Sequence, residues 1–199
     1  GPNITPGYWR APEATAEAFD EEGFFCTGDA VLWVDVADKH KGLRFDGRIA
    51  EDFKLATGTF VSVGPLRGRV IAGGAPYIQD VVVTGLNRHE VGALVFPTQA
   101  VRSLVDLPPD APFETVLKQH AVLQKFQSLV TDLSLTATGS ANRVTRLMLM
   151  AEPPSIDLGE VTDKGSINQR AVLKHRDDLV QALYDEPPGH IVIKPGVNL

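Results

Sequence analysis

The chain has 199 residues, of which 43% are hydrophobic and 22% are charged, a balance that supports a packed core and excludes disorder as the main state. Nineteen lysines and arginines against 25 aspartates and glutamates give a net charge of −6. Because no basic block is present, nucleic acid is not expected as a partner. No run approaches the roughly 18 apolar residues of a membrane span, and no leader pattern opens the sequence, so we expect neither a transmembrane helix nor a signal peptide.

Cysteine and histidine usage narrows the chemistry further. The single cysteine, Cys26, cannot form an internal disulfide, which fits a reducing compartment and makes a cytoplasmic location the default expectation. The five histidines lack the spacing of metal ligands, so no metal site is expected, and His120 is expected as a partly buried helix residue. The sequence contains neither a Gly-x-Ser-x-Gly elbow nor a Gly-x-x-x-x-Gly-Lys-[Ser/Thr] phosphate loop.

The N-terminal part is predicted to contain one short helix followed by a strand pair. Residues 1–20 have the composition of a loop, with a helical segment at 12–18 that begins on a proline. Strand-like runs follow at 30–36 and 43–45, and the polar residues 38–42 between them are typical of a hairpin turn. We therefore expect an antiparallel pair that needs another surface to pack against.

The remainder has the pattern of an α+β domain over roughly residues 50–185. Apolar residues recur at spacings of three and four over 112–135, which predicts a long amphipathic helix with one buried face. A second helix is predicted over 168–184. The other expected elements are a strand at 60–63, a short helix at 65–71, strands at 78–84 and 93–96 joined by a hairpin at 86–92, a strand at 143–150 and an irregular tail at 189–199.

Two groups of polar residues are candidates for ligand binding. Asp29 and Arg48 lie in glycine-centred turns at the two ends of the predicted strand pair, where an acceptor and a forked donor could hold a polyhydroxylated ligand. The alternative is a surface salt bridge. The loop 162–166 carries a lysine that could reach a neighbouring surface as a movable charge, or could simply be solvated. The adjacent carboxylates at 51–52 and 177–178 do not share a face and make poor acid–base pairs.

Four segments stand out by their order and spacing, namely Gly1–Trp9, Phe24–Asp29, Phe45–Arg48 and Phe53–Arg67. The first three resemble the adenylate-forming acyl-CoA synthetase superfamily, entered after its phosphate loop. The fourth is more particular and resembles the feruloyl-CoA synthetase branch, which joins hydroxycinnamic acids to coenzyme A. The resemblance covers almost the whole chain.

The resemblance implies a reaction in two steps, in which ATP and a carboxylic acid give an acyl-adenylate and the thiol of coenzyme A then displaces AMP. It also implies the fold: residues 50–199 would form the family's small, mobile C-terminal domain, an α+β unit with a mixed sheet and flanking helices. Residues 1–49 would be a strand pair from the end of the large AMP-binding domain. That missing N-terminal domain would be the partner of this chain and would bind most of the Mg²⁺ and ATP, so the chain alone is expected to be inactive.

The family's site residues fall on positions in this sequence. The aspartate of the Thr-Gly-Asp motif and the arginine of the Gly-Arg motif hold the ribose hydroxyls of the nucleotide. The small domain swings about a hinge, here residues 49–52, and presents first a lysine loop and then a glycine-containing strand and loop. The resemblance implies Lys164 as the catalytic cation and Thr27, Asp29, Arg48, Lys54 and Gly58 as residues that bind the nucleotide or coenzyme A.

Three positions depart from the family pattern. Ala50 stands at the usual hinge position, and Pro65-Leu66-Arg67 replaces Glu-x-Glu, which supports the narrower branch. Ser166 stands in the column of the family's lysine, two residues after Lys164, and Arg170 is the next candidate cation. The alternatives are a noncatalytic interaction module that keeps the fold, and a ligase for fatty or benzoic acids.

Overall fold

The computed structural model describes residues 1–186 and 189–196. The chain divides into two compact units, Gly1–Ala50 and Glu51–Leu199. These are the first unit and the second unit of the chain.

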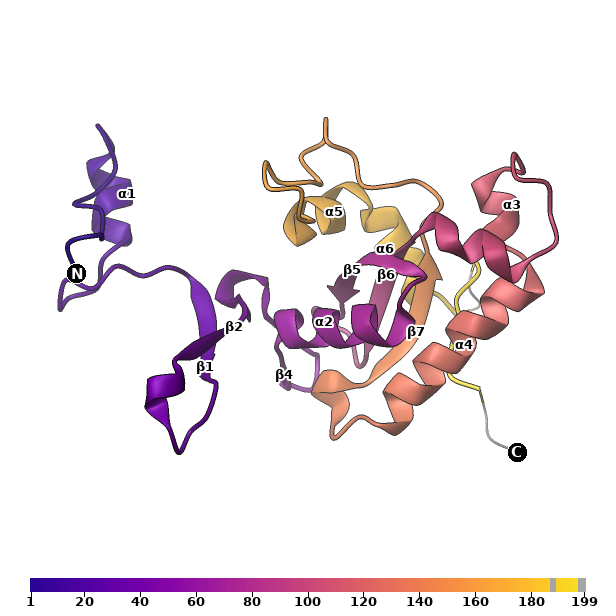
Figure 1. Ribbon diagram of the computed structural model, residues 1–199, viewed down its shortest axis with the longest axis horizontal. Helices are drawn as coiled ribbons and strands as arrows, with labels where there is room; N and C mark the ends of the chain where they lie inside the picture. Colours follow the sequence, from indigo (N-terminus) through magenta and orange to yellow (C-terminus); the bar gives the residue numbers. More distant parts are fainter. Residues whose placement is uncertain (187–188, 197–199) are drawn as a thin grey trace. The chain divides into compact units, whose positions relative to one another are not determined.

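The first unit is a short helix followed by a two-stranded antiparallel sheet (Figure 1). The predicted strand pair is confirmed, although its first strand ends at Trp33 and its second continues to Arg48. Asp29 and Arg48 are partners in the sheet, with an irregularity between Asp29 and Val31. The elements are α1 (Pro12–Glu17), β1 (Asp29–Trp33), η1 (Lys39–Lys41), β2 (Leu43–Arg48) and, at the boundary of the units, η2 (Ile49–Glu51).

The first unit has no hydrophobic core of its own. Gly47 is the only buried residue among residues 1–50, all of which the structure describes. Large apolar side chains such as Trp33, Leu43 and Phe45 are exposed. Since an isolated two-stranded sheet is marginally stable in water, this pair requires the packing surface that its sequence predicts.

The second unit is built around a three-stranded mixed sheet in the order β5-β6-β7. β5 and β6 are antiparallel neighbours, whereas β6 and β7 are parallel and are joined through α3 and α4. The predicted α+β class with a mixed sheet is therefore confirmed. Its elements are β3 (Phe53–Lys54), β4 (Phe60–Val61), α2 (Val63–Gly74), β5 (Ile78–Thr84), β6 (Val91–Pro97), η3 (Gln99–Leu104), α3 (Phe113–Leu117), α4 (His120–Leu135), η4 (Ser140–Asn142), β7 (Val144–Leu149), α5 (Gln169–His175) and α6 (Asp177–Tyr184).

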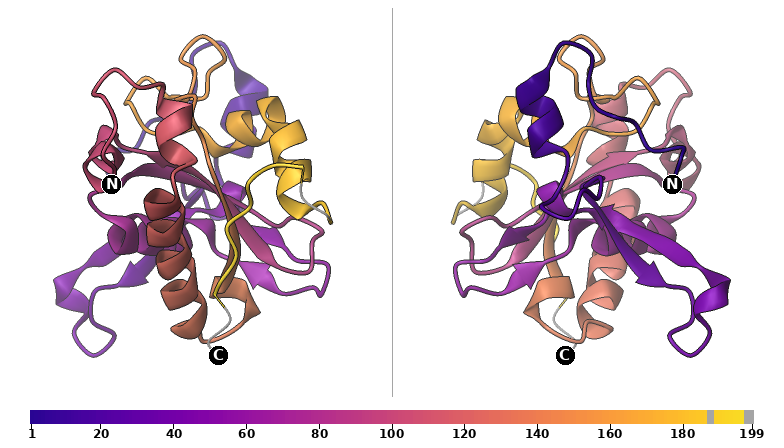
Figure 2. Two further views of the ribbon diagram at one scale, coloured as in Figure 1. Left: turned by 90° about the vertical axis from the view of Figure 1, so that its right-hand side faces the viewer. Right: turned by 90° about the vertical axis from the view of Figure 1, so that its left-hand side faces the viewer.

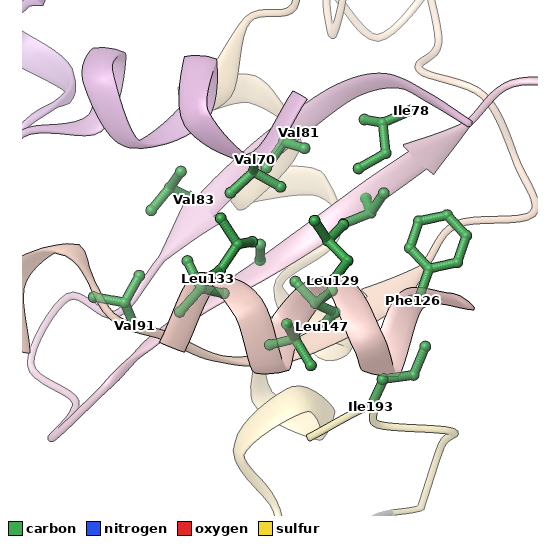
Figure 3. Close-up of a cluster of buried hydrophobic side chains, with 14 of the residues drawn as sticks. Val70, Ile78, Val81, Val83, Val91, Phe126, Leu129, Leu133, Leu147 and Ile193 are labelled. Atoms are coloured by element: carbon green, nitrogen blue, oxygen red, sulfur yellow. The ribbon is translucent and has the colours of Figure 1, made fainter. Parts of the chain in front are cut away.

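Helices cover both faces of this sheet, and alternate residues of the strands point to each face. Side chains from α2 and α4, among them Val70, Phe126 and Leu133, pack on Val81 and Val83 of β5 and on their neighbours (Figure 3). A second cluster on the other face joins the strands to α5 and α6. Its buried members are Val82, Leu94, Phe96, Met148, Met150, Ile167, Val172, Ala182 and Leu183.

Both long helices expected from the sequence are broken in two. The segment 112–135 forms α3 and α4, because Gln119 has an extended backbone with φ −69° and ψ 140°. The segment 168–184 forms α5 and α6, separated by Arg176 at φ −110° and ψ 30°. The apolar spacing continues across each break because the helices on its two sides face the same core, so the pattern alone cannot locate the break.

Smaller differences concern helix ends. α2 begins at Val63, two residues before the expected start, so its proline occupies the third helical position, where its missing N–H has no partner to lose. The N-cap residue Ser62 makes no side-chain capping bond, and the Val63 N–H at the start of the helix donates to Asp52 Oδ1 at 2.9 Å. His120 was expected to be partly buried and is exposed, because it opens α4 on the solvent side.

The C-terminal tail is more ordered than expected. Ile193 forms an antiparallel bridge with Leu147, in which each N–H donates to the other's carbonyl at 2.8 Å. The tail runs beside α4 (Figure 2, left) and places the Gly196 N–H 2.9 Å from Thr131 Oγ1. Ile193 is buried and belongs to the core. Residues 197–199, also expected in the irregular tail, lie outside the described residues.

Two leucines near the end of α4 test this core. Leu133 is 5% exposed and Leu135 is 67% exposed. We expect Leu133→Ala to lower the free energy of unfolding by about 2–5 kcal/mol, because it removes buried methyl groups and leaves a cavity. Leu135→Ala should change it by less than about 0.5 kcal/mol. Urea denaturation of the two variants measures both values, and equal losses would contradict the described packing of α4.

Candidate functional site

The strand pair of the first unit brings Asp29 and Arg48 together. They are partners in the sheet, and Arg48 Nε lies 3.7 Å from Asp29 Oδ1. Thr27 precedes them in the same turn, where its Oγ1 accepts from the Asp29 N–H at 3.2 Å. The Ile49 N–H donates to the Gly28 carbonyl at 3.0 Å, which ties the end of β2 to this turn.

The Asp29 carboxylate has an unused acceptor. Its Oδ1 atom is buried and has no hydrogen-bond partner, since Arg48 Nε at 3.7 Å is too far away for one. A buried carboxylate oxygen ordinarily has at least one donor. A hydroxyl group of a bound polyol would supply it, so the residues present fit the ribose of a nucleotide.

Lys54 and Gly58 belong to one small hairpin in the second unit. Lys54 is an exposed residue of β3, and Gly58 lies in the turn that leads to β4. Gly58 has φ +81°, a conformation that side chains other than glycine rarely adopt, and its N–H donates to the Leu55 carbonyl at 2.8 Å. The hairpin is held to the β5–β6 turn because the Asn87 N–H donates to the Lys54 carbonyl and the Ala56 N–H to the Arg88 carbonyl.

Lys164 is exposed at the tip of a tight turn between β7 and α5. Val161 and Ile167 form an isolated antiparallel bridge at the base of this turn. Within it the Thr162 N–H donates to the Ser166 carbonyl, and the Gly165 N–H to the Thr162 carbonyl, each at 2.8 Å. The name lysine turn is used below for residues 161–167. The hydroxyl groups of Ser166 and Thr162 are hydrogen-bonded to each other, with 2.8 Å between their oxygen atoms.

A buried ion pair, not anticipated from the sequence, lies directly below the lysine turn. Glu160 is only 1% exposed, and its two carboxylate oxygens accept from Arg176, Oε2 from Nη2 at 2.8 Å and Oε1 from Nε at 3.1 Å. The hydrogen bonds from Arg176 hold the pKa of the Glu160 carboxyl below its ordinary value, against the opposing effect of burial. In the sequence both residues look like ordinary surface charges, and no local pattern links them.

The structure therefore brings some predicted residues together and leaves others apart. Asp29, Arg48 and Thr27 share one turn region, and Lys54 shares a hairpin with Gly58. The lysine turn does not join that hairpin: Figure 1 places the segment between β7 and α5 at the top of the second unit, and β4 at the lower edge. The second unit thus carries two separate groups of candidate residues.

Two cavities lie in the second unit. One, of about 220 Å³, lies beside the hairpin of Lys54 and is lined by residues of β3, the β5–β6 turn, α5 and α6, including Phe53, Arg88 and Gln181. The other, of about 420 Å³, lies among α3, the end of β7 and the C-terminal tail, and Arg176 forms part of its wall. No predicted site residue is among the described residues that line either cavity.

Across residues 1–186 and 189–196, histidine, cysteine, aspartate and glutamate side chains nowhere gather in the groups of three that could hold a metal ion. No helix in the described part of the chain has the length and apolar character to cross a bilayer.

Comparison with known proteins decides the family. The profile of the family described as "AMP-binding enzyme C-terminal domain" matches residues 52–187, which is more than half of the chain. The chain belongs to the AMP-binding enzyme family. Its second unit is the C-terminal domain of that family, and its fold is that of adenylate-forming enzymes.

Relatives of this AMP-binding enzyme chain are proteins that act on acids. It is 28% identical over 193 residues to a long-chain-fatty-acid–[acyl-carrier-protein] ligase of Arabidopsis thaliana, covering 94% of this chain and 24% of the relative. It is 38% identical over 96 residues to a carboxylic acid reductase of Segniliparus rugosus, covering 48% of this chain and 8% of the relative.

A solved structure supports the same relationship. The A domain of the Segniliparus rugosus carboxylic acid reductase, in complex with AMP and a co-purified carboxylic acid, superposes with a TM-score of 0.66 and 27% sequence identity. The match covers 92% of this chain and 27% of that structure. The AMP-binding enzyme chain thus spans about a quarter of the length of the Arabidopsis relative and of this structure.

The Glu160–Arg176 pair predicts how stability depends on pH. Because the pKa of Glu160 is lower in the folded chain than in the unfolded one, its ionisation stabilises the fold above the ordinary carboxyl pKa of about 4.3, and this stabilisation is lost as the pH falls towards the folded pKa. At pH 7, Glu160→Gln should cost about 3–5 kcal/mol, since it leaves a guanidinium that is only 11% exposed without its charge partner. The cost should shrink in acid, where the wild-type carboxyl is also protonated.

Denaturation of the wild-type and variant chains over a range of pH measures this difference. Glu114→Gln is the matched control, because Glu114 is exposed and paired with Lys118 on the surface, and it should leave the stability nearly unchanged at every pH. A Glu160→Gln cost that stays constant from neutral to acid pH would contradict the assignment of an ionised, buried Glu160.

Proposed function

We propose that the protein containing this chain is an ATP-dependent ligase that joins a carboxylic acid to coenzyme A. The acid's oxygen attacks the α-phosphate of ATP and displaces pyrophosphate, and the thiol of coenzyme A then attacks the acyl carbon and displaces AMP. Residues 1–49 are the end of the large AMP-binding domain, and residues 50–199 are its mobile C-terminal domain. The large domain lies outside this chain and supplies the remaining nucleotide contacts and most of the Mg²⁺ binding.

The observation that carries this proposal is the buried Asp29 Oδ1 without a donor, beside Arg48. A vicinal diol has two hydroxyl donors, and an ionised carboxylate accepts such hydrogen bonds strongly. Asp29 binds the ribose hydroxyls, Arg48 holds the same side of the ribose, and Thr27 fixes the turn that presents the carboxylate. The exposed apolar side chains of this strand pair support its assignment to a larger domain.

The two separate groups in the second unit support a two-step mechanism. The lysine turn presents the Lys164 ammonium to the carboxylate and α-phosphate, where negative charge is stabilised while the acyl-adenylate forms. The hairpin with Lys54 and Gly58 is presented when the domain has rotated about residues 49–52, and it contributes to the binding of coenzyme A. Gly58 leaves room for coenzyme A to approach the backbone closely, because the space where a Cβ would lie is open, with nothing beyond its chain neighbours within 4 Å.

The acid that we propose is a hydroxycinnamic acid of the feruloyl type. This choice rests on the resemblance of residues 53–67 to the feruloyl-CoA synthetase branch. The names of the relatives, which refer to fatty acids and to carboxylic acids in general, make a fatty acid the second candidate, and benzoic acids a third. The acid pocket belongs to the large domain, so only assays of the complete protein separate these substrates.

One observation favours a noncatalytic module instead. Ser166 stands where the family carries lysine, and its hydroxyl is engaged with Thr162 inside the lysine turn. Formation of a CoA thioester by the complete protein from ATP and hydroxycinnamic, benzoic or fatty acids tests both functions. A complete protein that is folded, yet forms no thioester from any of them, would support the noncatalytic module.

Lys164→Ala tests the catalytic cation. We expect it to slow acyl-adenylate formation by about 10²–10³-fold, the usual cost of removing one electrostatic contact to the transition state. ATP–pyrophosphate exchange measures this step alone. Lys118→Ala is the matched control, since Lys118 is an exposed lysine of the same unit paired with Glu114. An undiminished exchange rate in Lys164→Ala would move the role to another cation, with Arg170 as the next candidate.

Asp29→Asn tests the ribose contact. The variant keeps the shape of the side chain and removes its charge, so it should raise the KM for ATP by about 10–100-fold, which corresponds to about 1.5–3 kcal/mol for hydrogen bonds to a charged group. Asp35→Asn is the control, because Asp35 is an aspartate of the same unit paired with Lys41. A KM for ATP that is the same in both variants would refute the role of Asp29.

A further inference from the structure

The lysine turn belongs to a long connection between β7 and α5 that contains little regular structure. Among residues 150–168, its described backbone pairing consists of the Val161–Ile167 bridge and a few turn hydrogen bonds. Lys164 is therefore carried by a segment that could take many conformations if nothing else held it. Any group that fixes the two ends of this segment also fixes where the Lys164 ammonium can reach.

Glu160 ties the middle of the connection to its end through its main chain and its side chain. Its N–H donates to the Ser155 carbonyl at 2.9 Å, and its carbonyl accepts from the Asn168 N–H at 2.8 Å. Its carboxylate Oε2 also accepts from the Ser155 N–H at 2.8 Å. Asn168 in turn caps α5, because its side chain accepts from the Ala171 N–H.

Arg176 attaches this junction to the sheet. Besides its two hydrogen bonds to Glu160, it donates to the Glu152 carbonyl at 3.0 Å and to the Pro153 carbonyl at 2.8 Å. Its guanidinium lies 5.0 Å from the ring centre of Phe96, a buried residue of the central strand β6. One side chain at the break between α5 and α6 thus binds the start of the connection, the base of the lysine turn and the core.

Stability alone does not account for such a pair. A buried ion pair is often no more stabilising than apolar residues of the same volume, because both charges lose their hydration. What the pair supplies is a fixed geometry, since a guanidinium and a carboxylate meet in one planar arrangement. Lys164 lies only four residues along the chain from Glu160.

We propose that Glu160 and Arg176 are positioning residues for Lys164, which set the place of its ammonium group during formation of the acyl-adenylate. The proposal rests on the function proposed above for Lys164. Neither residue contacts the substrate; both act through the lysine turn. Movement of a reacting or stabilising group by about 1 Å is enough to cost on the order of 100-fold in rate, so a small loosening of the turn has a measurable effect.

The first test needs no catalytic activity and uses the chain itself. Arg176→Lys keeps the positive charge and loses the planar fork, so we expect hydrogen exchange at the Thr162 and Gly165 amides to rise by about tenfold or more. The control is Arg67→Lys, which loosens another two-pronged pair of this unit, from Arg67 to Asp80. Unchanged exchange in Arg176→Lys would overturn the proposal while leaving the proposed function intact.

The second test is a double-mutant cycle in the complete protein. Arg176→Lys should slow ATP–pyrophosphate exchange by about 10–100-fold with a nearly unchanged KM for ATP, and should leave thioester formation from supplied acyl-adenylate unchanged. In a Lys164→Ala background, Arg176→Lys should have no further effect, because its influence passes through Lys164. Equal slowing with and without Lys164, or equal slowing of both steps, would indicate a general structural role and overturn the proposal.

Glu160→Gln serves as the second variant if Arg176→Lys does not fold, because it keeps the shape and one acceptor oxygen of the side chain. Glu160→Gln should likewise slow ATP–pyrophosphate exchange when Lys164 is present and have no further effect in the Lys164→Ala background. If Lys164→Ala alone leaves exchange unchanged, the proposed role of Lys164 fails, and the positioning role fails with it. If Lys164→Ala slows exchange but the cycle is additive, only the positioning role fails, so the two failures are distinguishable.

Discussion

Every residue of the central strand β6 is buried, and this burial organises the second unit. Its residues alternate between the cluster shared with α2 and α4 and the cluster shared with α5 and α6. Both pairs of helices must therefore bring an apolar face to the same strand. The connection after β7 leads from the end of the sheet to α5, and its long irregular course carries the lysine turn.

The elements that the sequence predicts well are those in which the spacing of apolar residues along the chain shows which residues are buried. Strand 78–84 was predicted with its observed ends, because the β-branched run at its end, residues 81–84, is typical of a strand buried on both faces. The breaks at Gln119 and Arg176 were missed, since the residues on both sides of each break face one core and preserve the helical spacing. Tertiary packing sets the direction in which each helix axis runs, and the spacing of apolar residues contains no information about that direction.

The same distinction holds for the candidate site. Asp29 and Arg48 could be placed together because two antiparallel strands with one connection bring their outer ends side by side. Glu160 and Arg176 could not, because the pairing depends on how the break between α5 and α6 turns back towards the end of β7. The motif resemblance made Lys164 the candidate cation but contained no information about the residues that hold its turn.

The bridge between Ile193 and Leu147 has a consequence for how chains meet one another. β7 is an edge strand, and on its outer side the tail takes up the backbone groups of Leu147. Edge strands with free backbone groups and apolar side chains are templates for pairing between molecules. By pairing with Leu147, the tail occupies backbone groups on this edge that would otherwise be open to a strand of another chain.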